Sequence, residues 1–219
     1  MGNTEYTKQY FEAYAKFSLQ YHYDDCFKWI RKKECPDFQS KKYNLGLEVT
    51  RAISRDDGRI WSFINQYYGK ETGGHVIKNG IDKRFKGRFR ARAGTMGDTA
   101  YFSSDLDDAQ IIIKTVETIH TKLKKLNHHY KVFARNYLYI FGETGLFEGE
   151  ILGDIKKRVQ DFDYPVKFDV IFINAIDRLF VMDFTRDEIE EKKMDEESLK
   201  WCAKNAFRIC AAWEKKRTK

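Results

Sequence analysis

Apolar runs of strand length alternate with helical patterns along this chain, and that alternation constrains its fold more than any other feature. LGLEVTRA (45–52) and NYLYIFG (136–142) each have the length and the β-branched or aromatic content of one strand. FDVIFINAIDRLFVMDF (168–184) reads as two strands joined through residues 174–177. The whole order is helix, strand, strand, insertion, helix, strand, helix, hairpin and helix, which predicts an α/β domain with a mixed sheet.

Two amphipathic helices bracket the first strands. Residues 4–30 carry an aromatic stripe at spacings of three and four, and residues 105–126 carry an aliphatic stripe of the same period. We expect Ser104 or Asp105 to cap the second helix and Asn127 to end it.

The C-terminal part contains further helical signals. Helices are predicted at about 147–161 and from about 195 onward. Thr185 with Glu188 resembles a capping box, which predicts a charged helical turn between them.

Length and composition fit a single folded domain over residues 1–219. The 40 Lys and Arg against 33 Asp and Glu give a formal net charge of +7, which is compatible with a phosphate-rich partner. The four cysteines lack the close spacing of a zinc site, so we expect free thiols in a reducing cytoplasm. No run of about 18 apolar residues occurs, so no membrane association is expected.

A pair of carboxylates lies in the segment CPDFQSKKYNLGLEVTRA, at residues 35–52. Pro36 breaks the chain before Asp37, the KKYN segment (41–44) predicts a turn, and Glu48 falls in the following strand. Neighbouring strands can bring the two side chains to one magnesium ion, since Mg²⁺ needs only one or two protein carboxylates beside water and substrate phosphate.

The Pro-Asp and Glu spacing, together with the order of elements, resembles the PD-(D/E)XK nuclease superfamily over residues 5–53 and 104–142, with residues 54–103 as an insertion. The resemblance implies a restriction endonuclease-like core that hydrolyses phosphodiester bonds with Mg²⁺ or Mn²⁺. It implies Asp37 and Glu48 as catalytic metal ligands. A Glu of the first helix often joins them in this superfamily, which makes Glu12 the first candidate and Glu5 the second. For each of them, an ordinary solvated helix residue is the alternative. Many members are dimers, so a homodimer is a further expectation.

Thr50 departs from the superfamily motif, because it stands where a lysine is expected two residues after the Glu. A hydroxyl carries no positive charge and does not replace that lysine electrostatically. In some members the lysine lies on the following helix, and here a helical wheel places Lys122 and Lys124 on the two margins of the apolar stripe. We choose Lys122 as the relocated catalytic lysine; a solvated lysine on an exposed helix edge is the alternative.

The segment KRFKGRFRAR (83–92) alternates cations with apolar or small residues. In a strand, one face would hold five cations that can follow a nucleic-acid backbone, with DNA expected ahead of RNA as the partner. The alternative is a solvated edge strand that charge protects from aggregation. The predicted nucleic-acid-binding residues are Arg84, Lys86, Arg88, Arg90 and Arg92.

The leading hypothesis from the sequence is a metal-dependent nuclease. A second hypothesis is a catalytically inactive, nuclease-like protein that binds nucleic acid or serves in assembly, and Thr50 motivates it. A third is a module whose basic strand binds an acidic protein. The first two differ in whether Asp37 and a metal ion are needed.

Overall fold

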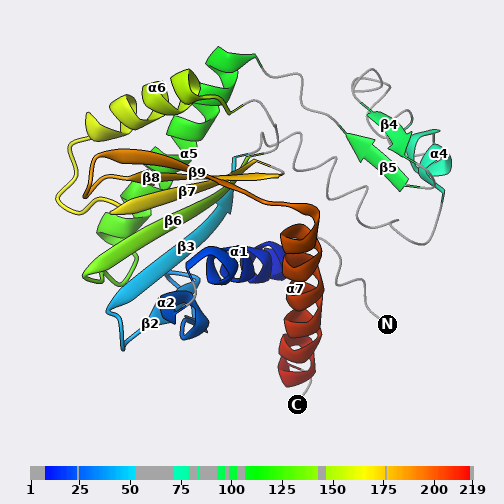
Figure 1. Ribbon diagram of the computed structural model, residues 1–219, viewed down its shortest axis with the longest axis horizontal. Helices are drawn as coiled ribbons and strands as arrows, with labels where there is room; N and C mark the ends of the chain where they lie inside the picture. Colours follow the sequence, from blue (N-terminus) through cyan, green and yellow to red (C-terminus); the bar gives the residue numbers. More distant parts are fainter. Residues whose placement is uncertain are drawn as a thin grey trace.

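A seven-stranded mixed sheet with helices on both faces forms the centre of the protein in a computed structural model (Figure 1). The structure describes residues 8–23, 25–52, 72–78, 83, 93–96, 99–102, 107–142, 147–175 and 177–217. Its strands are β1 (Arg31–Lys32), β2 (Phe38–Ser40), β3 (Leu45–Arg51), β6 (Arg135–Gly142), β7 (Val170–Ala175), β8 (Arg178–Asp183) and β9 (Glu188–Lys193). The helices around it are α1 (Lys8–Tyr23), α2 (Asp25–Lys28), α5 (Asp108–His128), α6 (Gly149–Gln160) and α7 (Glu196–Arg217).

The strand order is β1-β2-β3-β6-β7-β8-β9. The first three strands form an antiparallel meander, β3, β6 and β7 are parallel to one another, and β8 and β9 return antiparallel. A parallel neighbour needs a crossover connection, and α5 lies in the connection between β3 and β6, as α6 does between β6 and β7. The predicted α/β class and mixed sheet are therefore confirmed.

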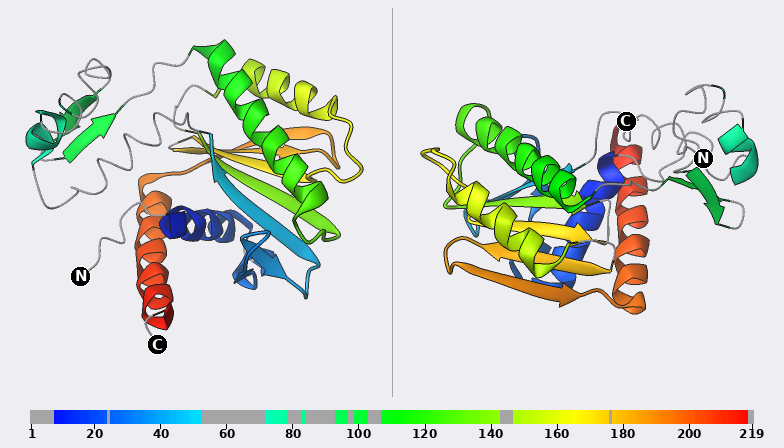
Figure 2. Two further views of the ribbon diagram at one scale, coloured as in Figure 1. Left: turned by 180° about the vertical axis from the view of Figure 1, so that it is seen from behind. Right: turned by 90° about the horizontal axis from the view of Figure 1, so that it is seen from above.

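Alternate residues of the central strands divide into two cores. Leu47 and Val49 of β3 join Tyr139 of β6 in the core against α1 and α7. Leu138 and Ile140 of β6 point the other way, into the core against α5 and α6. This alternation follows from the two-residue repeat of a strand, and Figure 2 shows the helices on opposite sides of the sheet.

The start of α5 differs from the sequence-based expectation. Its N-cap is Asp107, whose carboxylate accepts the Gln110 N–H at 2.8 Å while the Gln110 side chain accepts the Asp107 N–H at 3.3 Å. This reciprocal capping box satisfies helix-terminal donors and so begins the helix after Asp107. The predicted caps Ser104 and Asp105 lie outside the described residues. The other end of the helix is His128, one residue past the predicted stop.

The helical turn predicted from Thr185 and Glu188 is wrong. Asp183 accepts hydrogen bonds from Thr185 N and Thr185 Oγ1, at 2.9 and 2.7 Å, which folds a turn after β8. Asp187 has a φ of 58° at the end of that turn, and Glu188 starts strand β9. Thr185 thus donates to a preceding carboxylate instead of capping a helix. At the N-terminus, the long predicted helix is two helices, α1 and α2.

The insertion is described in part. It contains α4 (Gly73–Val76) and an antiparallel pair, β4 (Ala93–Met96) with β5 (Thr99–Phe102). The predicted cationic residues Arg84, Lys86, Arg88, Arg90 and Arg92 lie outside the described residues, so that interface stays a prediction.

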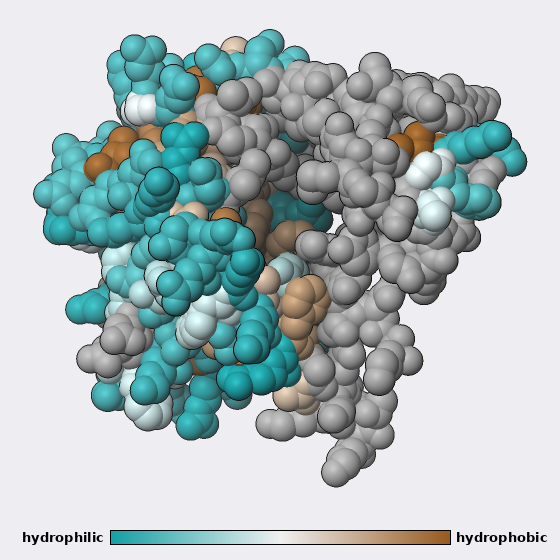
Figure 3. All heavy atoms as spheres, turned by 45° about the vertical axis from the view of Figure 1, so that its right-hand side comes forward, coloured by the Kyte–Doolittle hydropathy of each residue, from teal (hydrophilic) through white to brown (hydrophobic). Residues whose placement is uncertain are grey.

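The surface of the described part is consistent with the composition. The face drawn in Figure 3 is mainly hydrophilic over the described residues. All four cysteines are free. Within the described ranges, no helix is both long and apolar enough to cross a lipid bilayer.

Candidate active site

Asp37 and Glu48 meet across two neighbouring strands. Phe38 of β2 pairs with Leu47 of β3, and continuing that register by one residue sets Asp37 opposite Glu48. Both are buried, with 7% and 5% of their surface exposed. Two buried acidic residues opposite each other are unfavourable unless cations or donors compensate them, which marks this position as chemically unusual.

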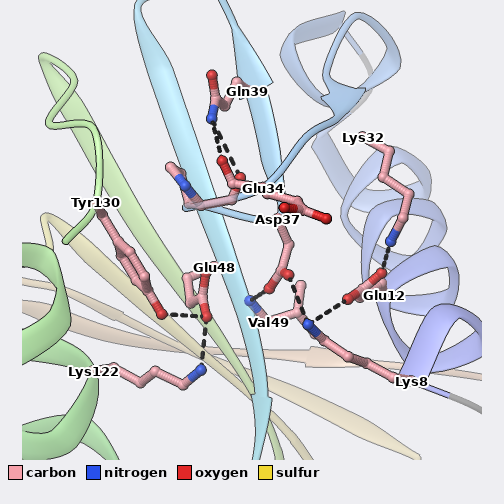
Figure 4. Close-up of polar contacts among 11 residues, drawn as sticks. Lys8, Glu12, Lys32, Glu34, Asp37, Gln39, Glu48, Val49, Lys122 and Tyr130 are labelled. Carbon is pink, nitrogen blue, oxygen red and sulfur yellow. Dashed lines mark hydrogen bonds and ion pairs between the residues drawn. The ribbon is translucent and has the colours of Figure 1, made fainter.

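Glu48 is held by two groups from the α5 side of the sheet. Lys122 Nζ of α5 and Tyr130 Oη each lie 2.6 Å from Glu48 Oε1 (Figure 4). Lys122, the chosen lysine, thus directs its amine toward Glu48, whereas Lys124 is exposed. Its catalytic role stays a prediction. Both donors converge on one oxygen, and no described residue donates to Oε2.

The pKa of Glu48 is raised by its buried position between these groups. Burial raises the pKa of Glu48, the nearby charge of Asp37 raises it further, and Lys122 and Tyr130 lower it only in part. Burial and the contact with Glu48 also raise the pKa of Tyr130 far above its ordinary value, so Tyr130 remains a hydrogen-bond donor. An additional cation beside Glu48 would favour its ionised form.

Asp37 is positioned by the backbone at the end of β2. Its Oδ2 accepts the Val49 N–H at 2.9 Å, and its Oδ1 lies 3.5 Å from Lys8 Nζ of α1. Figure 4 shows this carboxylate directed toward α1, while Glu48 is directed toward α5 and Tyr130. The strand register places the two residues opposite each other, while their carboxylates are directed to different partners.

The corner that carries Asp37 depends on Gly46. A Cβ at Gly46 would lie 2.6 Å from Phe133 Cδ2 and 2.9 Å from Pro36 Cγ, so a side chain would displace one of these rings. The Lys131 N–H also donates to the Cys35 carbonyl at 3.1 Å. The segment that follows α5 and the corner before β2 are thus packed together over one glycine.

Glu12 of α1 extends the cluster beyond Asp37. It is 2% exposed and pairs with both Lys32 of β1 and Lys8, the latter at 3.3 Å. The reading of Glu12 as an ordinary solvated helix residue is therefore wrong. Because Lys8 contacts Glu12 and Asp37 together, it links the two carboxylates (Figure 4). Glu5, the second candidate, lies outside the described residues.

Thr50 does not supply the missing cation. It is half-buried on β3, two residues past Glu48 and on the same strand face. The ammonium that reaches Glu48 comes instead from Lys122, 74 residues later in the chain. A lysine amine therefore reaches Glu48 from helix α5 and not from strand β3.

Tyr130, Lys8 and Lys32 were not found from the sequence. The pairing of Lys8 with Glu12 has a readable signal, since residues four apart share a helix face. Tyr130 has none, because it follows α5 in an irregular segment and reaches Glu48 only through the tertiary fold. Lys32 likewise reaches Glu12 only because β1 packs beside α1.

The carboxylates of Asp37 and Glu48 are of the ligand type that Mg²⁺ prefers, although both Asp37 oxygens already have partners in Val49 N and Lys8. Asp37 and Glu48 offer the hard carboxylate oxygens that Mg²⁺ prefers, and Glu48 Oε2 receives no hydrogen bond from a described residue. Among the described residues, no three His, Cys, Asp or Glu side chains are grouped closely enough to hold a metal ion. A metal here would therefore rely on two carboxylates, water and substrate, with Glu12 joining only if Lys8 releases it.

Comparison with known proteins gives no relative from which to transfer a function. No family model, no curated protein and no solved structure matches this chain.

Proposed function

We propose that this protein is a nuclease that hydrolyses phosphodiester bonds of nucleic acid with Mg²⁺ or Mn²⁺ as its cofactor. One observation carries the proposal: the Lys122 amine lies 2.6 Å from buried Glu48, which stands opposite Asp37 on the next strand. A buried carboxylate with a raised pKa, beside a second carboxylate and a lysine from a separate element, is typical of functional sites.

Each residue has a definite task in the proposed reaction. Asp37 and Glu48 would hold the metal ion, which when bound polarises a phosphodiester and lowers the pKa of water. Lys122 would orient the attacking water and offset negative charge that develops on the phosphate. Tyr130 would fix the Glu48 carboxylate by holding Oε1, which leaves Oε2 for the metal.

The topology supports a restriction endonuclease-like core. From α1 to β6, the helices α1 and α2 precede an antiparallel meander of three strands, and α5 and the parallel strand β6 come after the insertion. Fold-level likeness raises the expectation of nuclease chemistry, while the site residues carry the argument. The proposed substrate is nucleic acid, with DNA ahead of RNA, and a homodimer remains part of the proposal.

The decisive experiment combines cleavage with metal-dependent stability. We expect Mn²⁺ or Mg²⁺ to raise the melting temperature and to support cleavage of single- or double-stranded DNA or RNA. Asp37→Asn should abolish both effects, and Asp154→Asn, an exposed acid on α6, should abolish neither. Absence of cleavage of every substrate, together with absence of a metal-dependent shift, would overturn the proposal.

A non-catalytic nucleic-acid-binding protein on the same scaffold is the second candidate. Its supporting observation is that lysines already neutralise the carboxylates: Lys8 contacts Asp37, and Lys8 and Lys32 both contact Glu12. In that case nucleic-acid binding would persist in a metal chelator and weaken as the salt concentration rises. The Asp37→Asn substitution would leave the affinity unchanged. The two candidates are thus separated by the same variant.

A further inference from the structure

An exposed tryptophan with two lysines near its ring lies just before β1, the strand at one edge of the seven-stranded sheet. Trp29 follows α2 and is 54% exposed, which is unusual for a residue that is normally at least partly buried. Lys28 Nζ lies 5.9 Å and Lys42 Nζ 5.5 Å from the indole ring. Lys42 also lies 4.9 Å from the ring of half-buried Tyr43.

Further exposed cations lie close to Trp29 and Lys42 in the sequence. Arg31 and Lys33 flank Lys32 around β1, and Lys41 adjoins Lys42 in the turn between β2 and β3. None of the five exposed cations forms an ion pair with any residue that the structure describes, whereas Lys32 is engaged with Glu12. Glu34 is the one exposed carboxylate between residues 28 and 43. The Trp29 surface, as we name it, consists of Lys28, Trp29, Arg31, Lys33, Lys41 and Lys42.

We propose that the Trp29 surface binds single-stranded nucleic acid, with a base stacked on the indole and phosphates paired with the surrounding lysines. This inference rests on the proposed function, because it assigns a substrate form to that site. Stacking on an exposed aromatic ring within a cationic groove tolerates any base, and is the common means of holding single strands. The lysine–indole contacts are weak at an exposed site, so phosphates can take over the ammonium groups.

Position connects this surface with the proposed active site. Strand β2 spans Phe38–Ser40, with Asp37 at one end and the turn of Lys41 and Lys42 at the other. At the usual rise of a strand, the separation is on the order of 13 Å. The turn that carries Lys42, which contacts Trp29, and the residue Asp37 thus lie at opposite ends of one short strand.

An acidic protein is the competing partner for a cationic surface, and the indole argues against it. Carboxylates would pair with the lysines alone and gain little from an exposed aromatic face. A nucleotide uses both features, since it joins a planar base to a phosphate. The lysines and the exposed indole of the Trp29 surface together therefore fit a nucleic acid better than an acidic peptide.

Binding can be measured apart from cleavage. We suggest fluorescence anisotropy with a labelled mixed-sequence single strand, in metal chelator, on the Asp37→Asn background. Adding Trp29→Ala should weaken binding at least about fivefold, and Trp29→Phe should retain part of the affinity. Adding Lys28→Gln with Lys42→Gln should lower the slope of log affinity against log salt by about 1.4. Lys157→Gln with Arg158→Gln on exposed α6 positions removes the same charge and should have little effect.

The outcomes separate this inference from the proposed nuclease activity. If Trp29→Ala leaves the affinity unchanged, or if a duplex of the same sequence binds equally well, the proposed role of the Trp29 surface is overturned. The nuclease proposal would be unaffected. Binding of poly-glutamate that depends on the lysines but not on Trp29 would overturn the proposed role of the Trp29 surface too. If binding depends on Trp29 but the unsubstituted protein cleaves no substrate, the nuclease proposal is refuted and the proposed role of the Trp29 surface is kept. Melting temperatures equal to that of the parent would show that the variants are folded.

Discussion

Two buried carboxylates, Glu48 of β3 and Asp183 of β8, have similar partners and opposite protonation behaviour. Burial acts to raise the pKa of both. At Asp183, hydrogen bonds from Thr185 and Arg186 more than offset burial and lower the pKa to about 2. At Glu48, Lys122 and Tyr130 offset burial and the charge of Asp37 only in part, and the pKa stays raised.

The number and origin of the donors explain the difference. Asp183 accepts two backbone and two side-chain hydrogen bonds, all from Thr185 and Arg186 in the turn that follows it. Glu48 accepts from two distant side chains, both on one oxygen. A locally satisfied carboxylate stabilises a turn, whereas an incompletely compensated one retains affinity for a further cation.

The largest expected contrast between the two sites is in cleavage. Glu48→Gln should reduce metal-dependent cleavage by roughly a thousandfold or more, because it removes a metal ligand while keeping its shape. Asp183→Asn should leave the rate per folded molecule unchanged. Single-turnover assays on both variants measure this, and equal losses would contradict the distinction.

Lys122 should show the next largest effect. Lys122→Met removes the ammonium beside Glu48 and should lower the cleavage rate about 10²- to 10³-fold. Lys124→Met is the matched control on the same helix, and its side chain is exposed. A comparable loss in both variants would assign the effect to helix charge in general, not to Lys122.

Tyr130→Phe tests the second donor with a change of one oxygen. It should destabilise the fold by about 1 kcal/mol and raise the pKa of Glu48 further. The acidic limb of the pH–rate profile should therefore move to higher pH. An unchanged profile with lower stability would mean that Tyr130 is only structural.

The contributions of Glu48 and Asp183 to the free energy of unfolding should change with pH in opposite directions. The raised pKa of Glu48 means that its favourable contribution is complete below its unfolded pKa and is lost as the pH rises through its folded pKa. The lowered pKa of Asp183 means that its contribution is present above its unfolded pKa of 3.8 and is lost as the pH falls toward about 2.

Urea unfolding at several pH values measures both contributions. Asp183→Asn should cost about 1.5 kcal/mol near pH 7 and progressively less below pH 4. Glu48→Gln should become relatively more stabilising as the pH rises above the ordinary carboxyl range. A loss of stability at neutral pH for Glu48→Gln would show that Lys122 and Tyr130 compensate Glu48 fully.

Local patterns were sufficient for most of the fold. The strand run containing Glu48 and the aliphatic stripe of α5 each fix one element and the direction of its side chains, and that was enough to place Lys122 near β3. The register that sets Asp37 opposite Glu48 followed from a short turn between two strands.

The sequence-based predictions failed where a side chain had two possible local partners, or where its partner is distant in the sequence. Thr185 had a capping partner in Glu188 but bonds Asp183 instead, because β8 had already placed that carboxylate beside the turn. The partnership of Tyr130 with Glu48 spans 82 residues and depends on how α5 crosses the sheet. No pattern in either local sequence encodes such a contact.

The missing side chain at Gly46 has a consequence for how the site can vary. Phe133 and Pro36 close over that glycine, so the corner bearing Asp37 and the segment bearing Tyr130 form one mechanical unit. A side chain at Gly46 would press on both rings at once, so we expect a substitution there to disturb the Asp37 corner and the Tyr130 segment together.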